Sequence, residues 1–530
     1  MSQVVVAEVA RGLAAAYPSD PVTIHDRLTR LAGTRGFLAG SASMSLAGHG
    51  KRLLAGGVAL LTLLAACFSN SSAPATGGGS QTSSTGGSSG GIPSDAGAGA
   101  GDGASSAPLA STTAPATIMI TGTTPVTAPP TSYGHNYWDW VSSYGDQVAE
   151  VQSGATAMKL NVLRAGGHNN DNNNPQPFTN DQIDTFVVYA RAVGAEPILQ
   201  VPLLADASDA RPTAQTAADM VTYANVTQKY GIKYWEIGNE PDLYSDQGDL
   251  PTGYTAASYC SDFGTFADAM RAVDPTIQIL GPELSYKYVA GNDWLTPFLT
   301  NCGSKVDIVS VHRYPFAAAA STIANAMGDG TQFRSTLTRL RTTMNSLGLA
   351  SKPLAITEAN FSYQGDPTLQ TGTAALGTFY AGMWVADTMG IALEANVWTM
   401  AFWSLDEDYY TGFFTSDTFQ PRPAAYAYEL LSTHFGPTIL NATTVPTGMS
   451  AYASRDDAAK KTVVLLINRT ADASSQVLGF TNLTVTPSNW SVTLPAYALL
   501  LIELPDDGSA PASWLYTKAM ADAEQGPQRQ

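Results

Sequence analysis

Between residues 131 and 403 the chain alternates short apolar, β-branched runs with longer segments of helical periodicity. The strand-like runs are residues 131–137, 160–165, 196–203, 232–238, 277–281, 308–312, 354–357 and 396–403. The helical patterns are residues 179–193, 213–230, 258–273, 333–347 and 371–389. This alternation favours parallel βαβ units, and eight such units predict a closed α/β barrel. An open doubly wound sheet is the rival, but it usually has a glycine-rich loop after its first strand, where this chain has Trp138-Asp139-Trp140.

The apolar pattern changes to strict alternation near residue 449. Runs such as KTVVLLINR and ALLLIEL have a period of two and no helical segment between them, which predicts strands with one buried face. We therefore expect a barrel domain over residues 117–440 and a small all-β sandwich over residues 441–505. Residues 117–125 can add a strand to the sandwich, and residues 506–530 are expected to be a disordered tail.

A short hydrophobic segment near the N-terminus is typical of an export signal. Residues 53–66 form an apolar run after Lys51 and Arg52 that is too short to span a bilayer. The run ends in LAAC at Cys67, which resembles the lipobox of bacterial lipoproteins and implies cleavage before Cys67 and lipidation of its thiol. Residues 1–67 are then an upstream segment and signal peptide, with Met44 as the expected start. The alternative is a core helix, but the residues that follow cannot supply a core.

Residues 68–116 consist almost wholly of Gly, Ser, Thr, Ala and Pro, as in GGGSQTSSTGGSSGG, and show no fixed repeat. Such a composition predicts a flexible linker. We therefore expect an exported protein that is anchored to the cell envelope or cell surface by the lipid on Cys67, with no other contact to the membrane.

The charge balance excludes a nucleic-acid binder. The 530 residues include 27 Lys or Arg and 44 Asp or Glu, so the net charge is −17 and no basic face is available for phosphates. Hydrophobic residues make up 44% of the chain, enough to bury a large core. Three cysteines are too few for a multi-thiolate metal site. Once Cys67 is lipidated, Cys260 and Cys302 remain to form a disulfide, and the sequence does not show whether they are within reach.

Two glutamates follow predicted barrel strands, whose carboxyl ends meet at one mouth. The fourth strand leads into YWEIGNEPD, with Glu240, and the seventh into AITEAN, with Glu358. Cleavage of a glycosidic bond needs one carboxyl group to protonate the leaving oxygen and another to attack or stabilise the anomeric carbon. The pair predicts a glycosidase site. Taken alone, Glu240 is also consistent with a helix cap, since Glu-Pro-Asp suits a first helical turn.

These motifs resemble those of the clan A glycoside hydrolases, whose eight-stranded TIM-type barrels carry a retaining carboxylate pair at these strand ends. Further motifs fit at the ends of the second, sixth and eighth strands: RAGG at Arg164, HRYP at His312 and AFWS with Trp403. The barrel-plus-sandwich layout, with YASRD and VVLLINR near the C-terminus, most resembles glycoside hydrolase family 44, the endo-β-1,4-glucanases and xyloglucanases.

The resemblance implies that Glu240 is the acid/base and Glu358 the nucleophile. Arg164 beside Glu358 would keep that carboxylate ionised, while Glu240 must have a raised pKa to arrive protonated. Asn239 is the expected hydrogen-bond partner of the sugar 2-hydroxyl. The other expected substrate-binding residues are Arg164, His312, Tyr314, Trp403 and Glu283.

Several of these residues also have plainer interpretations. Glu236 and Glu283 compete for the catalytic roles, but Glu236 lies four residues before Glu240 and therefore deeper in the barrel, while Glu283 closes the fifth strand and is expected to bind substrate or shape the rim. Arg164 and His312 also suit purely structural roles. Trp138, Trp140, Trp398 and Trp403 all suit the core, and Trp403 is the best sugar platform because it lies at a strand end.

The run HNNDNNN at residues 168–174 follows the second strand. Oxygen-rich clusters can bind calcium, but this spacing matches no EF-hand loop, and a polar loop that contacts sugar hydroxyls is the favoured interpretation. We therefore expect no metal and no cofactor, with calcium as the alternative. The sequence also lacks the Gly-x-Ser-x-Gly and His-Glu-x-x-His motifs of esterases and metalloproteases.

Together these features predict a monomeric hydrolase that cuts a polysaccharide, a β-linked glucan or xyloglucan, by a retaining double displacement and at internal bonds. Related glycosidases that act on arabinofuranosides, glucuronides, xylan or galactan share the framework and are the nearest alternative. Alternatives from other classes are a non-catalytic surface glycan-binding lipoprotein and an adhesion protein that acts through its sandwich. The presence of both Glu240 and Glu358 argues against the glycan-binding alternative, and a large apolar patch on the sandwich would favour the adhesion alternative.

Overall fold

The computed structural model describes residues 109–137, 146–172, 178–205, 210–289, 291–364, 374–407 and 411–530. The chain divides into two compact units, Met1–Asp95 and Ala96–Gln530, and all described residues belong to the second. The expected signal peptide, Cys67 and most of the expected linker lie outside the described residues, as do Trp138 and Trp140.

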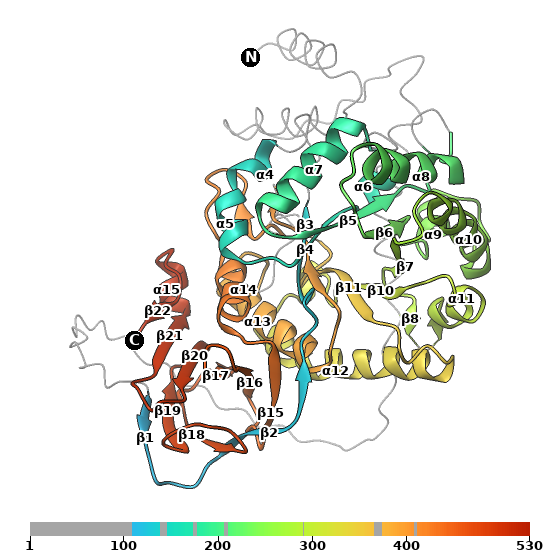
Figure 1. Cartoon of the computed structure of the whole chain (residues 1–530). Coiled ribbons are helices and arrows are strands. Elements are labelled where there is room, and N and C mark those ends of the chain that lie inside the picture. Colours follow the sequence, from blue (N-terminus) through green and yellow to red (C-terminus); the bar gives the residue numbers. More distant parts are fainter. Residues whose placement is uncertain are drawn as a thin grey trace, which may run out of the picture. The chain divides into compact units, whose positions relative to one another are not determined.

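Eight parallel strands close into a barrel, as the alternation of strand and helix patterns predicted (Figure 1). Each strand pairs with the next one along the chain, and the eighth pairs with the first. The barrel strands are β3 (Tyr133–Tyr137), β4 (Val162–Ala165), β5 (Glu196–Val201), β6 (Tyr234–Ile237), β7 (Gln278–Leu284), β10 (Ile308–Arg313), β11 (Leu354–Ala359) and β12 (Met400–Phe402).

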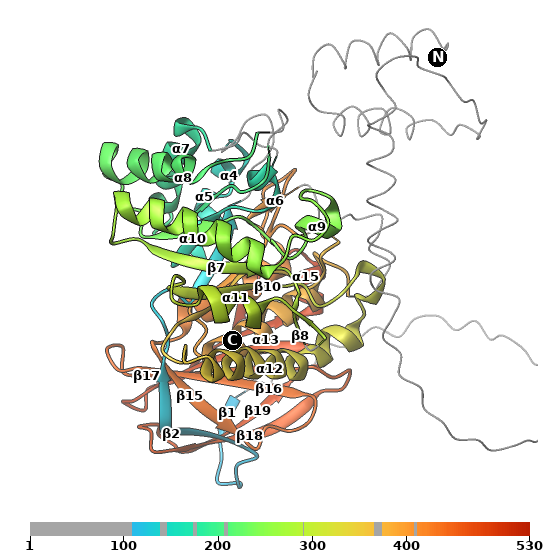
Figure 2. The same ribbon diagram turned by 90° about the vertical axis from the view of Figure 1, so that its right-hand side faces the viewer.

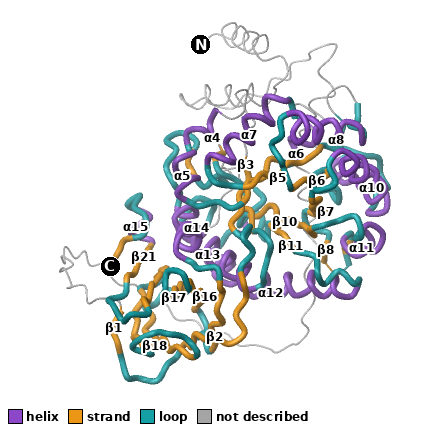
Figure 3. The backbone as a smooth tube through the Cα atoms, viewed as in Figure 1, coloured by secondary structure: helices purple, strands orange, loops and turns teal. Residues whose placement is uncertain are grey.

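Helices surround the barrel strands (Figure 3). Five of them begin after a threonine whose side chain accepts a hydrogen bond from a backbone N–H of the first turn, which satisfies a donor that the helix leaves free. These five are α7 (Asn180–Ala192), α8 (Ala214–Val221), α10 (Ala256–Val273), α12 (Ile323–Ser346) and α13 (Phe379–Glu394). Further helices are α6 (His168–Asn172), α9 (Tyr244–Gln247), α11 (Leu295–Cys302) and α14 (Pro423–His434).

Apolar side chains fill one end of the barrel and leave the other end polar. A small buried cluster comes from the first residues of the strands and is closed by Trp398 and Tyr234, whose rings meet edge to face at 4.8 Å. Trp398 is therefore a core residue, as its position before its strand indicated. The polar side chains at the opposite, carboxyl ends of the strands are held above this plug.

The C-terminal β domain is one continuous, mostly antiparallel sheet of ten strands around its own apolar core. Residues 117–125 add a strand as expected: β2 (Ile118–Thr127) lies between β18 (Ser474–Thr481) and β15 (Thr438–Thr443). The sheet continues through β16 (Met449–Asp456), β17 (Lys461–Asn468) and β20 (Ala498–Pro505), and β19 (Asn489–Leu494) pairs with β18. Figure 2 shows these strands gathered beside α12 and α13.

Two expected boundaries need correction. The linker ends earlier than residue 116, because β1 (Leu109–Ser111) pairs with β19. The tail is also ordered: β21 (Ala512–Thr517) pairs with β20, and α15 (Lys518–Asp522) and β22 (Gln528–Arg529) follow. The physical reason is the buried side chain of Tyr516, whose ring packs against Phe379 of α13 at 5.1 Å. The composition of the tail suggested disorder and concealed this one anchor.

Cys260 and Cys302 form a disulfide that joins α10 to α11, with their Cα atoms 5.7 Å apart. The bond closes a segment of 42 residues around β7. None of the described helices combines the length and the apolar character that crossing a bilayer requires.

The ordered tail gives the first testable prediction. Replacing Tyr516 by Ala removes a fully buried ring, so the free energy of unfolding should fall by about 3 kcal/mol. Chemical denaturation measures this change. As a control, Lys518→Ala, at an exposed position of the same segment, should change the free energy of unfolding by less than about 0.5 kcal/mol. Equal stability of the two variants would contradict an ordered tail.

Candidate active site

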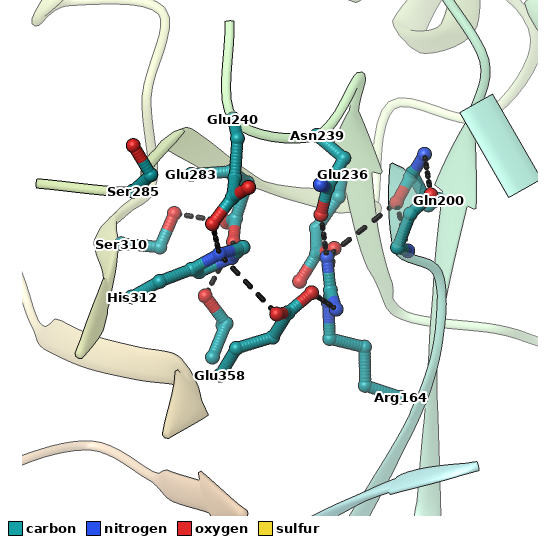
Figure 4. Close-up of polar contacts among 12 residues, drawn as sticks. Arg164, Gln200, Glu236, Asn239, Glu240, Glu283, Ser285, Ser310, His312 and Glu358 are labelled. Atoms are coloured by element: carbon teal, nitrogen blue, oxygen red, sulfur yellow. Dashed lines mark hydrogen bonds and ion pairs between the residues drawn. The ribbon is translucent and has the colours of Figure 1, made fainter. Parts of the chain in front are cut away.

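The polar residues of the mouth come from strand ends distributed around the barrel (Figure 4). Side chains alternate along a strand, so one residue in two points into the barrel. Inward-pointing polar residues come from seven strands and from the turn after β6: Asn136, Arg164, Gln200, Glu236, Asn239, Glu283, His312 and Glu358.

Glu240 and Glu358 approach each other beside His312 (Figure 4). One carboxylate oxygen from each glutamate and one ring nitrogen of His312 all lie within 4.8 Å of one another. His312 Nδ1 is 2.9 Å from Glu240 Oε1 and 3.5 Å from Glu358 Oε2. A separation of about 5–5.5 Å between two carboxyl groups is the spacing of retaining glycosidases, because it leaves no room for water between nucleophile and sugar.

Glu358 is held by donors on both oxygens. Arg164 Nη1 donates to Oε1 at 2.7 Å, and the Tyr314 hydroxyl donates to Oε2 at 2.9 Å. The Glu358 side chain is only 8% exposed. A guanidinium and a phenol therefore fix the orientation of this carboxylate, with one hydrogen bond to each oxygen.

Glu240 has a different environment. Its backbone has a φ of +50°, and its N–H donates to the Glu283 carbonyl at 3.0 Å, which fixes the turn after β6. The Glu240 side chain is 20% exposed and is therefore the more accessible of the two carboxyls. Burial raises the pKa of Glu240, although the hydrogen bond from His312 opposes the increase. This carboxyl is therefore suited to carry a proton.

Arg164 is completely buried and reaches five side-chain oxygens. Besides Glu358, it donates to Glu236 Oε2 at 2.6 Å and to the amide oxygens of Asn136 and Asn239 at 3.0 Å and of Gln200 at 3.4 Å. Coulombic attraction to its carboxylate partners outweighs burial and raises the pKa of Arg164. Glu236 therefore lies beneath the guanidinium, deeper than Glu240, as its sequence position indicated.

The structure places Glu283 differently from the expectation. Glu283 is completely buried behind His312, with His312 Nε2 at 3.2 Å from Oε2, and it accepts hydrogen bonds from the hydroxyls of Ser310 and Thr357. Because protein donors hold both of its oxygens, it does not shape the rim or contact a sugar there. Burial opposes ionisation of Glu283, but the hydrogen bond from His312 and the charge of Arg164 lower its pKa overall.

His312 carries a positive charge between the carboxyl groups. Burial alone would lower its pKa, but Glu358, Glu240 and Glu283 together raise it to about 10. Among the described residues, Glu240, His312 and Glu358 form the group with the geometry of a metal site. In this structure the imidazole bridges the two carboxyl groups, with hydrogen-bond contact to Glu240 and a longer approach to Glu358.

Trp403 and Gly167 form one wall of the mouth. A β-carbon on Gly167 would lie 2.8 Å from Cη2 of Trp403, and the φ of Gly167 is +112°, so the indole can lie here only against glycine. Trp403 is half-buried at this wall. Asn239 lies beside Glu240, and its Oδ1 is bound by Arg164.

The Asn-rich run does not have the arrangement of a calcium loop in its described part. Asp171 is completely buried, and its carboxylate accepts hydrogen bonds from Leu203 N, Asn239 N and the Tyr244 hydroxyl. Asn173 and Asn174 lie outside the described residues.

Sequence reasoning missed the residues that support the pair from below. It assigned no role to Asn136 or Gln200, it placed Asp171 only within a polar loop that contacts sugar, and it treated Glu236 only as a rival catalytic residue. The available signal was the strand period. Asn136 and Arg164 are opposite each other on adjacent strands, as are Gln200 and Glu236, and Gln200 lies two residues beyond Ile198, the partner of Arg164.

The buried carboxyl of Glu236 gives a prediction about pH. Burial raises its pKa to about 8, despite the charge of Arg164. Because this value exceeds the ordinary one of about 4.5, the folded state retains a proton that the unfolded state has lost, and the associated stability disappears as pH rises through about 8. The Tm of the wild type should therefore fall relative to that of Glu236→Gln between about pH 5 and pH 8.

Thermal unfolding across this pH range provides the test. Glu196→Gln, at a half-buried position paired with Arg191 outside the mouth, is the matched control and should follow the wild type. Parallel curves for the wild type and Glu236→Gln would contradict the raised pKa.

Comparison with known proteins places this geometry in a family context. Residues 221–466 match the family model of Glycosyl hydrolases family 39. Three similar solved structures align with this chain over nearly their whole length. A Paenibacillus polymyxa xyloglucanase from glycoside hydrolase family 44 is 16% identical, with a TM-score of 0.56 over 73% of this chain and 99% of its own. A family 51 α-L-arabinofuranosidase from Bifidobacterium longum is 14% identical, with a TM-score of 0.59 over 74% of this chain and 100% of its own.

The third structure, a bifunctional glucanase-xylanase from a metagenome library, is 16% identical, with a TM-score of 0.57 over 73% of this chain and 98% of its own. No curated protein matches the sequence. At these identities the structures show the fold, and the match to the family model, which includes both Glu240 and Glu358, adds the sequence motifs. Proteins of these families need no cofactor for hydrolysis. In the sequence motifs of residues 221–466 and in its fold, the chain is similar to the clan A glycoside hydrolases.

Proposed function

We propose that the protein hydrolyses internal β-linked bonds of a glucan or xyloglucan by a retaining double displacement. Glu358 is the nucleophile and Glu240 the acid/base. The observation that carries this proposal is the placement of the two carboxyls within 4.8 Å of each other, one ion-paired with Arg164 and the other with a raised pKa.

In the first step, protonated Glu240 gives its proton to the leaving glycosidic oxygen while Glu358 attacks the anomeric carbon. The Arg164 guanidinium and the Tyr314 hydroxyl orient the attacking carboxylate. The C–O bond to the leaving group breaks, and an ester forms between Glu358 and the sugar.

In the second step, Glu240 acts as a base. Formation of the ester removes the negative charge of Glu358, one of the causes of the raised pKa of Glu240, so Glu240 ionises more readily. Its carboxylate then takes a proton from water, which attacks the anomeric carbon, breaks the bond between that carbon and Glu358, and releases the sugar with retained configuration. His312, which donates to Glu240, stabilises the carboxylate that forms.

The choice of β-glucan or xyloglucan rests on relatives. A xyloglucanase and a glucanase-xylanase are among the similar structures, and Trp403 offers the aromatic surface on which a glucosyl ring stacks. α-L-Arabinofuranosidases are also among them, so arabinan is the principal competing substrate. Loops at the mouth decide between these substrates, because the shared fold does not fix the substrate.

A polymer panel tests both the reaction and its substrate. The compact unit from residue 96 onward should release reducing ends from β-glucan or xyloglucan, in preference to xylan, arabinan or galactan. Glu358→Gln should abolish release, and Glu240→Gln should lower kcat by about 10² to 10⁴-fold. Glu394→Gln, on a glutamate ion-paired with Arg334 at the end of α13, is the matched control and should leave release unchanged.

NMR of the first anomer released should show retained configuration. Release from arabinan alone would overturn the substrate proposal but keep the reaction class. Binding of a polymer without any release by the wild type would overturn the hydrolase proposal and favour a glycan-binding lipoprotein.

We further propose that the chain is exported and lipid-anchored through Cys67. In a bacterial host, the wild type should incorporate a labelled fatty acid and sediment with membranes, whereas Cys67→Ser should do neither. Ser69→Ala, two residues away, should behave like the wild type. Labelling of Cys67→Ser at the wild-type level would contradict lipidation at this cysteine.

A further inference from the structure

Three loops of the barrel mouth meet at one buried carboxylate. Asp171 comes from α6 after β4, Leu203 follows β5, and Asn239 follows β6. Leu203 N donates to Asp171 Oδ1 at 2.6 Å, and Asn239 N donates to Oδ2 at 3.1 Å. Since a loop backbone has no regular pairing of its own, these two bonds define where the loops stand relative to α6.

A tyrosine completes the arrangement from a fourth element. The Tyr244 hydroxyl, from α9, donates to Asp171 Oδ2 at 2.5 Å and also accepts from Asn239 N at 3.0 Å. Both side chains have zero exposure. Gly238 leaves room for the tyrosine, because a β-carbon there would lie 2.5 Å from its hydroxyl oxygen. The contact therefore depends on three residues: Asp171 and Tyr244, which make it, and Gly238, which has no side chain to block it.

Ionisation of Asp171 fits its surroundings. Burial raises the pKa of Asp171 to about 6, while the hydrogen bonds from Tyr244, Leu203 and Asn239 oppose the increase. At neutral pH the group is therefore an anion that accepts from all three donors. Asp171 has no exposed surface and protein donors hold both of its oxygens, so we expect it to act through these donors and not by contact with substrate.

The position of Asn239 affects the acid/base Glu240 directly, because one peptide bond joins the two residues. Glu240 directly follows Asn239, and its own N–H is fixed by the Glu283 carbonyl at 3.0 Å. The turn is thus held on one side by Asp171 with Tyr244, and on the other by β7. A proton donor must lie within hydrogen-bond reach of the leaving oxygen, so a small shift of this turn affects the step in which Glu240 acts.

We propose that Asp171 and Tyr244 form a latch, a pair of positioning residues that holds the Asn239–Glu240 turn in the geometry required for acid catalysis. This inference rests on the proposed function, because it concerns the same acid. It gives the Asn-rich run a role other than binding calcium or sugar.

Paired aryl glycosides test the latch with the full chain. Phenyl β-cellobioside needs an acid to expel phenol, whereas 2,4-dinitrophenyl β-cellobioside has a leaving group that departs unaided. Asp171→Asn and Tyr244→Phe should each lower kcat on the phenyl substrate by about 10- to 100-fold, with little change in KM. On the dinitrophenyl substrate the same variants should lose less than about threefold in the burst rate of aryl release, which reports the first step alone and not the base role of Glu240 in the second step. The kcat of the double variant on the phenyl substrate should be no lower than that of the less active single variant, because both substitutions break the same contact.

A second tyrosine–aspartate pair supplies matched controls. The Tyr223 hydroxyl donates to Asp184 at 2.9 Å on the outer helices, so Tyr223→Phe and Asp184→Asn should leave both substrates unaffected. If Asp171→Asn does not fold, as judged by circular dichroism, Tyr244→Phe still decides the question, because it keeps the two backbone bonds to the carboxylate.

Each outcome has a distinct meaning. Equal losses on both substrates would overturn the latch, since a general loss of folded protein does not depend on the leaving group. Full activity of Asp171→Asn and Tyr244→Phe on the phenyl substrate would also overturn it, while leaving the hydrolase proposal intact. An inactive wild type on both substrates would overturn the proposed function, and with it the latch.

Discussion

The buried guanidinium of Arg164 is the interaction on which the barrel mouth depends. Its N–H groups point to oxygens from four other strands or the turns that follow them, so it ties together positions far apart in the chain: Asn136, Gln200, Glu236, Asn239 and Glu358. A completely buried guanidinium needs a protein acceptor for each of its N–H groups. Removing one partner of a buried ion pair typically lowers the free energy of unfolding by about 3–5 kcal/mol. The nucleophile candidate Glu358 therefore belongs to the same hydrogen-bond network that holds the barrel strands together at the mouth.

Charge balance explains why four carboxyl groups can lie so close together. Glu236, Glu240, Glu283 and Glu358 have two nearby cations, Arg164 and His312. Two of the carboxyls can be neutralised by these cations, and the other two need a proton. Burial raises the pKa of Glu236 and of Glu240, whereas the pKa of Glu283 is lowered. The environment thus separates proton carriers from anions, which is how one site can provide both an acid and a nucleophile.

The barrel and its carboxyl pair were predictable from sequence because they depend on periodic signals. Strand runs alternate with helical segments, and a residue at a strand end lies at the mouth whatever its loop does. Glu240, Glu358, Arg164 and Trp403 were found in this way, although their catalytic roles stay predictions. What could not be predicted depends on contacts between loops. The burial of Glu283 behind His312 and the bonds of Asp171 require knowing which loops meet. The order of the tail depends on the pairing of β21 with β20 and on the burial of Tyr516.

The central claim is that Glu358 attacks the sugar, and covalent trapping tests it most directly. A 2-deoxy-2-fluoro glycoside with a good leaving group slows breakdown of the ester, so intact-protein mass spectrometry should show one added glycosyl unit and peptide mapping should place it on Glu358. A glycosyl adduct on another carboxylate, such as Glu236, or turnover of this substrate without any adduct, would contradict the account.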